Sequence, residues 1–302
     1  MTQDSKLAQS IDKGNFIITA EYLPRASAVF SLTEDVITAL KSFHAVNVAD
    51  NPYGIVMSSL AGAMGLSQAG IEPIYQLVTR DRNRIALGSD LLGAASLGIK
   101  NVLCLSGYHQ TLTKCPESAN VYDIDSIQLA DAVNKMNNDK VLPDGIKIEG
   151  DFSMLIGSVA NQNLKPLELN MIRLAKKIEA GAKFIQTQAI FDVKVFAEWL
   201  EAADKEGLTK KTAILASVMP LEDAQEGEIL RDTFTDYNIP DEIIGRIKKA
   251  GDKEAQRKEG LKISVEIINE VKKLTGLRGI HILSGGNEAI LPELLSQSGL
   301  GK

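Results

Sequence analysis

Residues 84–106 read Arg-Ile-Ala-Leu-Gly-Ser-Asp-Leu-Leu-Gly-Ala-Ala-Ser-Leu-Gly-Ile-Lys-Asn-Val-Leu-Cys-Leu-Ser. The first part has apolar residues at helical spacing and ends before Gly98, a residue type that often terminates a helix in the left-handed conformation. The second part, residues 101–106, is a short apolar run typical of a strand that is buried on both faces. A helix followed by a buried strand is the repeating unit of a parallel sheet.

The same alternation continues along the chain. Strands are predicted at residues 16–23, 45–50, 73–79, 101–106, 153–159, 184–190, 213–220 and 279–284. Helices are predicted between and after them at residues 32–43, 56–69, 84–97, 124–136, 166–180, 193–203, 252–274 and 288–297. Eight such units favour an α/β fold, a (βα)8 TIM barrel that forms a single domain over residues 1–302. An open doubly wound sheet is the alternative, and residues 1–15 are expected to be a polar N-terminal extension or a first helix.

The composition excludes several classes of protein. The 302 residues include 33 Lys+Arg and 39 Asp+Glu, a net charge of −6, so we expect no nucleic-acid binding driven by charge. No apolar stretch reaches the about 18–20 residues that span a bilayer, and no signal peptide is recognisable at the N-terminus. The two cysteines, Cys104 and Cys115, and the three histidines lack metal-ligand spacing. We therefore expect a cytoplasmic protein without membrane insertion and without a metal site.

Two long connections are predicted, at residues 106–123 after the fourth strand and at residues 221–239 after the seventh. In a barrel, both connections lie at the carboxyl ends of the strands. Active sites of TIM barrels are built at that end.

Polar side chains near the predicted strand ends are the candidate site residues. Glu21 is either paired within the core or a general acid whose pKa is raised by burial. Asp50 and Arg82, after the second and third strands, either form turns and helix caps or orient an anionic cofactor. Gln186 and Gln188 share one face of the sixth strand, where they either bond within a core layer or contact a ligand.

Taken in order, these segments resemble the methylenetetrahydrofolate reductase family, a flavin-containing (βα)8 barrel. Residues 19–25, Thr-Ala-Glu-Tyr-Leu-Pro-Arg, are similar to the family's first-strand segment, with its essential glutamate at Glu21. The closest stretch is residues 177–192, Lys-Ile-Glu-Ala-Gly-Ala-Lys-Phe-Ile-Gln-Thr-Gln-Ala-Ile-Phe-Asp. Residues 79–84 and 121–126 resemble the short form found in acetogen-type one-carbon metabolism, which often works beside a second subunit.

The resemblance implies an enzyme that transfers a hydride from a reduced flavin to 5,10-methylenetetrahydrofolate, giving 5-methyltetrahydrofolate. Glu21 is then the catalytic acid, and Gln188 and Tyr108 bind the substrate. The implied flavin contacts are Asp50, Gln76, Ser106, Gly107, Tyr108, Tyr122, Arg173 and Lys177. The flavin phosphate is expected near Arg82 and Lys177. FAD is the expected flavin and FMN the alternative, and the electron donor is NAD(P)H or a partner subunit, in an oligomer.

One position departs from the family pattern. The family's strand-four loop carries an aspartate between flavin and pterin, whereas residues 106–109 are Ser-Gly-Tyr-His, so Tyr108 takes its place. A neutral phenol cannot supply the charge of a carboxylate. Two alternatives therefore stay open: a repurposed flavin-binding relative or partner subunit with weak or no folate reduction, and a folate-binding methyltransferase barrel.

Overall fold

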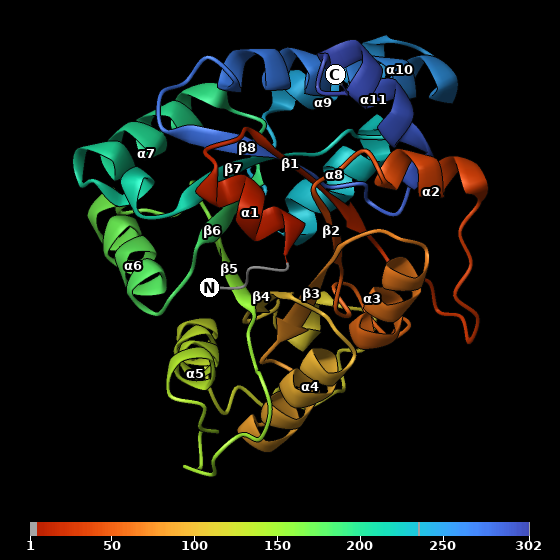
Figure 1. Cartoon of the computed structure of the whole chain (residues 1–302). Coiled ribbons are helices and arrows are strands. Elements are labelled where there is room, and N and C mark those ends of the chain that lie inside the picture. Colours follow the sequence, from red (N-terminus) through yellow and green to blue (C-terminus); the bar gives the residue numbers. More distant parts are fainter. Residues whose placement is uncertain (1–4, 235, 302) are drawn as a thin grey trace.

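The protein is described here by a computed structural model that covers residues 5–234 and 236–301. Within these residues, eight parallel strands close into a barrel in chain order, with β1 hydrogen-bonded to β8 (Figure 1). The strands are β1 Ile17–Tyr22, β2 Ala45–Val48, β3 Pro73–Val78, β4 Asn101–Leu105, β5 Leu155–Ala160, β6 Phe184–Ala189, β7 Ala213–Val218 and β8 Leu277–Ile282. The predicted TIM barrel is confirmed, and closure of the sheet excludes the open doubly wound alternative.

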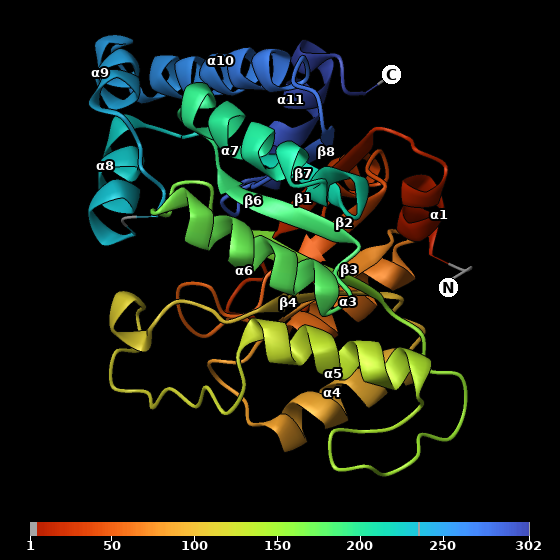
Figure 2. The ribbon, with the colours of Figure 1, turned by 90° about the vertical axis from the view of Figure 1, so that its left-hand side faces the viewer.

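Helices surround this barrel (Figures 1 and 2). The α-helices of the described residues are α1 Lys6–Asp12, α2 Glu34–Leu40, α3 Ser59–Gln68, α4 Arg84–Ser96, α5 Ser126–Asn138, α6 Leu167–Glu179, α7 Val193–Lys205, α8 Ala224–Thr233, α9 Asp241–Lys249, α10 Lys253–Val271 and α11 Leu291–Ser298. Short 3-10 turns lie at η1 Gln110–Leu112, η2 Leu208–Lys210 and η3 Glu288–Ile290. Of the predicted N-terminal segment, residues 1–4 lie outside the described part, and α1 occupies most of the remainder.

Short polar side chains begin several helices. Asn83 accepts a hydrogen bond from the backbone N–H of Ala86 at 3.1 Å and so caps α4. Asp125 accepts from Ile127 and Gln128, both at 2.8 Å, and caps α5. These bonds satisfy backbone donors that have no partner within the helix.

The predicted long connection at residues 221–239 follows β7 as expected, but it contains a helix, α8, that was not predicted. Asp223 begins this helix by accepting a hydrogen bond from Glu226 N at 2.8 Å. The buried face of α8 consists of Ala224, Gly227 and Leu230. Two of these three residues are small, so large apolar side chains do not recur at helical spacing in the sequence of α8. The connection at residues 106–123, by contrast, contains only the 3-10 turn η1.

The interior of the barrel is layered. At the amino-terminal ends of the strands, side chains from α1 and the strands form an apolar cluster of Leu7, Ala8, Ile17, Ala45, Ile74, Leu103, Leu155, Phe184, Ala213 and Leu215. Above it lies a polar layer in which Asn47 and Gln186 exchange two hydrogen bonds, at 2.7 and 3.0 Å. In the same layer, His281 Nδ1 lies 2.9 Å from Thr19 Oγ1. Burial lowers the pKa of His281 to about 3, so this ring is neutral.

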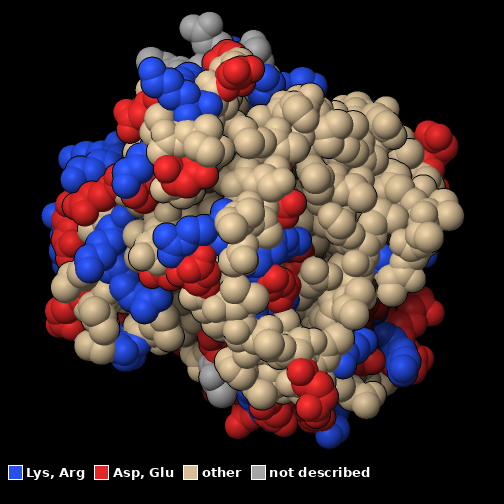
Figure 3. Space-filling view, turned by 90° about the horizontal axis from the view of Figure 1, so that it is seen from below, with Lys and Arg blue, Asp and Glu red and all other residues tan. Residues whose placement is uncertain are grey.

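The two ends of the barrel differ. Figure 2 shows α1 at one end and α8, with the connection after β4, at the other. On the face seen in Figure 3, basic side chains lie beside acidic ones, so this face has no continuous field of one sign. No helix among the described residues combines the length and the apolar character needed to cross a membrane.

Gly157 in β5 provides a test of the interior packing. A Cβ added there would lie 2.1 Å from the ring of Phe184, which is fully buried in the apolar cluster. We therefore expect Gly157→Ala to lower the free energy of unfolding by about 1–3 kcal/mol. Urea unfolding followed by circular dichroism measures this change.

Gly88→Ala in α4 is the matched control, since a Cβ there meets no other part of the protein within 4 Å. It should leave the free energy of unfolding unchanged or raise it by up to about 1 kcal/mol. Equal effects of the two substitutions would contradict the described packing of Gly157.

Candidate functional site

A cavity of about 630 Å³ opens at the carboxyl ends of the strands. Each strand, or the residues directly after it, contributes to the lining: Glu21, Asp50, Gln76, Leu105, Ala160, Gln188, Met219 and Leu283. The volume lies within the roughly 300–1,000 Å³ typical of small-molecule sites. Because active sites of this fold lie at the same end, the cavity is the candidate functional site.

The predicted site residues converge on this cavity, with two exceptions, Tyr122 and Arg82. The cavity is lined by Glu21, Asp50, Gln76, Ser106, Gly107, Tyr108, Arg173, Lys177 and Gln188. Tyr122 is 39% exposed and lies outside this lining, where its hydroxyl donates to the backbone carbonyl of Gly107 at 3.3 Å. The structure thus brings together residues from five strand ends and from α6.

Glu21 is positioned by β1, the strand in which it lies. Its Oε2 accepts a hydrogen bond from Gln76 Nε2 at 3.3 Å, and the described residues give it no basic partner within 4.0 Å. Burial raises the pKa of Glu21 to about 7; the Gln76 hydrogen bond opposes the rise, and the nearby charge of Glu288 adds to it. A carboxyl group with this pKa can hold and donate a proton near neutral pH.

Asp50, which is buried, forms an ion pair with the partly buried Arg82. Arg82 NH1 lies 2.7 Å from Asp50 Oδ2, and Arg82 Nε lies 2.9 Å from Asp90 Oδ2. Asp50 also accepts a hydrogen bond from the backbone N–H of Val78 at 3.0 Å. Since Arg82 is engaged by two carboxylates and lies outside the cavity lining, we assign it to the support of Asp50 rather than to a phosphate.

Arg80 holds the loop that follows β4, a role that the sequence did not reveal. This residue is 1% exposed, and its Nε is paired with Asp81 at 2.8 Å. Its guanidinium also donates to the backbone carbonyls of Tyr108 at 3.1 Å and Asn51 at 2.8 Å. The side chain therefore fixes the backbone that presents Tyr108 to the cavity.

Lys177 and Arg173 of α6 bring positive charge to one side of the cavity. Lys177 is 8% exposed, and its Nζ donates to the backbone carbonyl of Val159. No carboxylate of the described residues lies within ion-pair distance of it, and burial lowers its pKa to about 8, with the Arg173 charge adding to the effect. A buried cation without an acidic partner fits an anionic group of a ligand, such as the phosphate of a flavin nucleotide.

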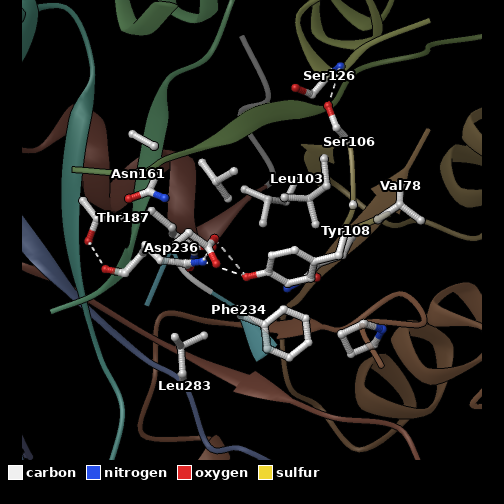
Figure 4. Close-up of a pocket in the computed structure, with 18 of the residues that line it drawn as sticks. Val78, Leu103, Ser106, Tyr108, Ser126, Asn161, Thr187, Phe234, Asp236 and Leu283 are labelled. Atoms are coloured by element: carbon white, nitrogen blue, oxygen red, sulfur yellow. Dashed lines mark hydrogen bonds between the residues drawn. The ribbon is translucent and has the colours of Figure 1, made fainter. Parts of the chain in front are cut away.

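Gln188, Tyr108 and Asp236 meet on the cavity wall (Figure 4). Gln188 Nε2 donates to Tyr108 Oη at 2.8 Å and to Asp236 Oδ2 at 2.5 Å, and the Tyr108 hydroxyl donates to the same Oδ2 at 3.1 Å. Phe234 packs on Tyr108, with ring centroids 4.5 Å apart. Sequence reasoning missed Asp236 and Phe234, and the only available signal was their position in the segment after the seventh strand.

The chain matches one family along nearly its whole length. The family model described as "Methylenetetrahydrofolate reductase" matches residues 6–299. "Methylenetetrahydrofolate reductase (NADH) 1" of Zea mays is 26% identical over 141 residues, which are 46% of this chain and 21% of the maize protein. "Probable methylenetetrahydrofolate reductase (NADPH)" of Caenorhabditis elegans is 20% identical over 293 residues, which are 95% of this chain and 40% of that protein. The matched regions thus span less than half of either relative.

Solved structures share the barrel. An uncharacterized protein from Clostridium thermocellum, described as binding two copies of 5-methyl-5,6,7,8-tetrahydrofolic acid, has a TM-score of 0.66 and 14% identity, with 98% of this chain and 99% of that chain covered. Oxaloacetate acetylhydrolase in complex with oxalate has a TM-score of 0.51 and 12% identity, with 99% and 86% covered. At these identities the likeness shows the fold alone.

The buried charge of Lys177 predicts a stability change that depends on pH. Because its pKa falls from 10.5 to about 8 in the folded protein, the unfolded chain holds this proton more tightly. In protein without flavin, Lys177→Met should therefore raise the free energy of unfolding by about 1–2 kcal/mol at pH 7. The gain should shrink between pH 8 and 10.5, where the folded wild type loses the proton while the unfolded chain keeps it.

Urea titrations at several pH values measure this gain. Lys176→Met, at the exposed neighbouring position, is the control and should show no comparable pH dependence. A gain for Lys177→Met that stays constant across the pH range would show that the wild-type charge is not buried as described.

Proposed function

The chain belongs to the methylenetetrahydrofolate reductase family, and on this basis we propose that it is a flavin-dependent enzyme that reduces 5,10-methylenetetrahydrofolate to 5-methyltetrahydrofolate. The observation that carries the proposal is Glu21, a carboxyl group in the cavity with a pKa of about 7 and no basic partner among the described residues. The methyltetrahydrofolate described for the Clostridium thermocellum neighbour supports a folate as the ligand.

In the proposed reaction, Glu21 donates a proton to N10 of the folate, and the bond between N10 and the methylene carbon breaks. The methylene carbon, now double-bonded to N5, is electron-poor. The hydride that completes the methyl group would come from a reduced flavin when one is bound in the cavity. The product therefore gains one proton and one hydride. Gln188 and Tyr108 hold the pterin ring, and the apolar cavity wall excludes water from the reacting atoms.

The cofactor site is proposed from the same cavity. Lys177 and Arg173 bind the flavin phosphate, and the backbone of Ser106 and Gly107 borders the ring system. The further proposed contacts are Asp50, Gln76, Tyr108 and Tyr122. FAD is the proposed flavin, with FMN as the alternative. NAD(P)H or a partner subunit supplies the electrons, in an oligomeric protein.

A second candidate function is favoured by one observation, the tyrosine at position 108 of the loop after β4. A flavin-binding relative or partner subunit that has lost folate reduction would tolerate the missing carboxylate of that loop. A methyltransferase barrel that binds folate but no flavin ranks third.

The visible absorption spectrum of the purified protein, followed by anaerobic addition of methylenetetrahydrofolate to the reduced sample, separates these functions. Flavin bands that reappear on addition of the folate support the reductase. Bands that stay bleached assign the protein to the second candidate. Absence of flavin, with failed reconstitution, removes redox chemistry and favours the methyltransferase.

Glu21→Gln tests the proposed acid. The variant can still bond to Gln76 but has no proton to donate, so folate-dependent reoxidation should slow by about 10²–10⁴-fold. Flavin content and reduction by the donor should not change. In the wild type, the protonated fraction of Glu21 falls as the pH rises through about 7, so reoxidation should slow about tenfold per pH unit above that value.

Anaerobic stopped-flow absorbance measures the reoxidation rate. Glu34→Gln, at an exposed position in the first turn of α2, is the control and should reoxidise like the wild type. An unchanged rate in Glu21→Gln would remove Glu21 from the acid role and leave the family assignment intact.

A further inference from the structure

We propose that Asp236 is the carboxylate that recognises the pterin ring of the substrate, so that the segment between α8 and α9 supplies the charge that the loop after β4 lacks. The inference rests on the proposed function, since it names a recognition residue of the same site. The ligand chemistry is a heterocycle with adjacent N–H donors along one edge, as in the aminopyrimidinone part of a folate.

The position of Asp236 carries the proposal. Its carboxylate lies in the cavity lining and bonds to Tyr108 and Gln188, the two residues proposed to hold the substrate (Figure 4). Tyr108 lies in the loop after β4, Gln188 in β6 and Asp236 after α8. Three distant segments thus form one polar cluster in a wall that is otherwise largely apolar.

The carboxylate is free to bind a ligand. None of the described basic residues lies within 4.0 Å of it, and the two described side chains that bond to it are neutral groups that donate to one oxygen, Oδ2. The other oxygen, Oδ1, accepts no hydrogen bond from the described residues. A carboxylate oxygen accepts hydrogen bonds only, so the chemistry of this position selects a ligand that presents N–H groups.

Tyr108 acts as a donor to Asp236 rather than as a replacement for its charge. Burial, with the charge of Asp236 adding to it, raises the pKa of the Tyr108 phenol well above its ordinary value. The phenol therefore keeps its proton at neutral pH and directs it toward Asp236. The hydroxyl and the Gln188 amide together orient the carboxylate.

The backbone around Asp236 is held by contacts with three other loops. Asn163 Nδ2 donates to the backbone carbonyl of Asp236 at 2.9 Å. Phe234 packs against Tyr108 and also against Tyr53, with ring centroids 5.5 Å apart in the second pair. Because these contacts come from the loops after β2, β4 and β5, the carboxylate has a defined place before any ligand arrives.

Asp236→Asn isolates the charge, because asparagine can still accept hydrogen bonds through its side-chain oxygen. We expect the affinity for 5-methyltetrahydrofolate, measured by anaerobic titration calorimetry on flavin-loaded protein, to fall about 10–100-fold. Flavin content and Tm should match the wild type. Asp232→Asn, an exposed carboxylate of α8 that lies 2.9 Å from Arg231, is the matched control and should bind with wild-type affinity.

Two variants that move the carboxylate from position 236 to position 108 distinguish recognition of the pterin from structural support. Tyr108→Asp alone places two carboxylates against each other, so we expect weaker folate binding. The double variant Tyr108→Asp/Asp236→Asn again has a single carboxylate at this contact, now in the loop after β4. It should bind folate at least tenfold more tightly than Asp236→Asn alone. A purely structural aspartate predicts no such recovery.

The outcomes separate this inference from the proposed function. Wild-type protein that binds no folate overturns both. Wild-type protein that binds folate, with Asp236→Asn equally tight, overturns the role of Asp236 alone. Loss of flavin or of the folded state in Asp236→Asn, without recovery in the double variant, also overturns it, because the residue then supports the fold.

Discussion

Closure of the sheet between β1 and β8 is the constraint on which the site depends. Gly279 faces the backbone of β1 so closely that a Cβ would lie 2.1 Å from the carbonyl oxygen of Ile17. The resulting register pairs Thr19 with His281, and the backbone N–H of Leu23, just after β1, donates to Glu288 in the connection after β8 at 3.1 Å. That connection carries Glu288, whose charge adds to the effect of burial on the pKa of Glu21. The last unit of the chain therefore adds to the burial that raises the pKa of the proposed acid.

The polar layer below the cavity explains why Glu21 remains available. Asn47 and Gln186 satisfy each other across the barrel, and His281 is neutral and bonded to Thr19. Because these groups use their hydrogen-bonding capacity within the layer, they bring no positive charge to the floor of the cavity. A histidine protonated at this depth would favour the ionised form of Glu21 and lower its pKa. Because His281 is buried in its neutral form, it does not lower the pKa of Glu21.

The sequence predicted the strands well and the long-range contacts poorly. Strands buried on both faces read as local apolar runs, and all eight were located to within a few residues. Arg82 could be misread because a cation after a strand looks the same whether it meets Asp50 or a phosphate. Glu21 was found through its unusual place in a strand and through family resemblance. Asp236 could not be found, since its contact with Tyr108 joins positions 128 residues apart and leaves no local pattern.

Two carboxylates in one cavity have different surroundings, and this difference divides their roles. Among the described residues, Glu21 receives one hydrogen bond, at 3.3 Å, and it lies near the like charge of Glu288. Asp236 receives two from the described residues, both from neutral donors and both at Oδ2, so its other oxygen has no described donor. A group that holds its proton near pH 7 suits proton transfer, whereas an oriented acceptor suits recognition of N–H donors. The carboxylate proposed to recognise the pterin can therefore come from a different segment than the loop after β4. A tyrosine in that loop is compatible with folate binding because the segment between α8 and α9 places Asp236 against it.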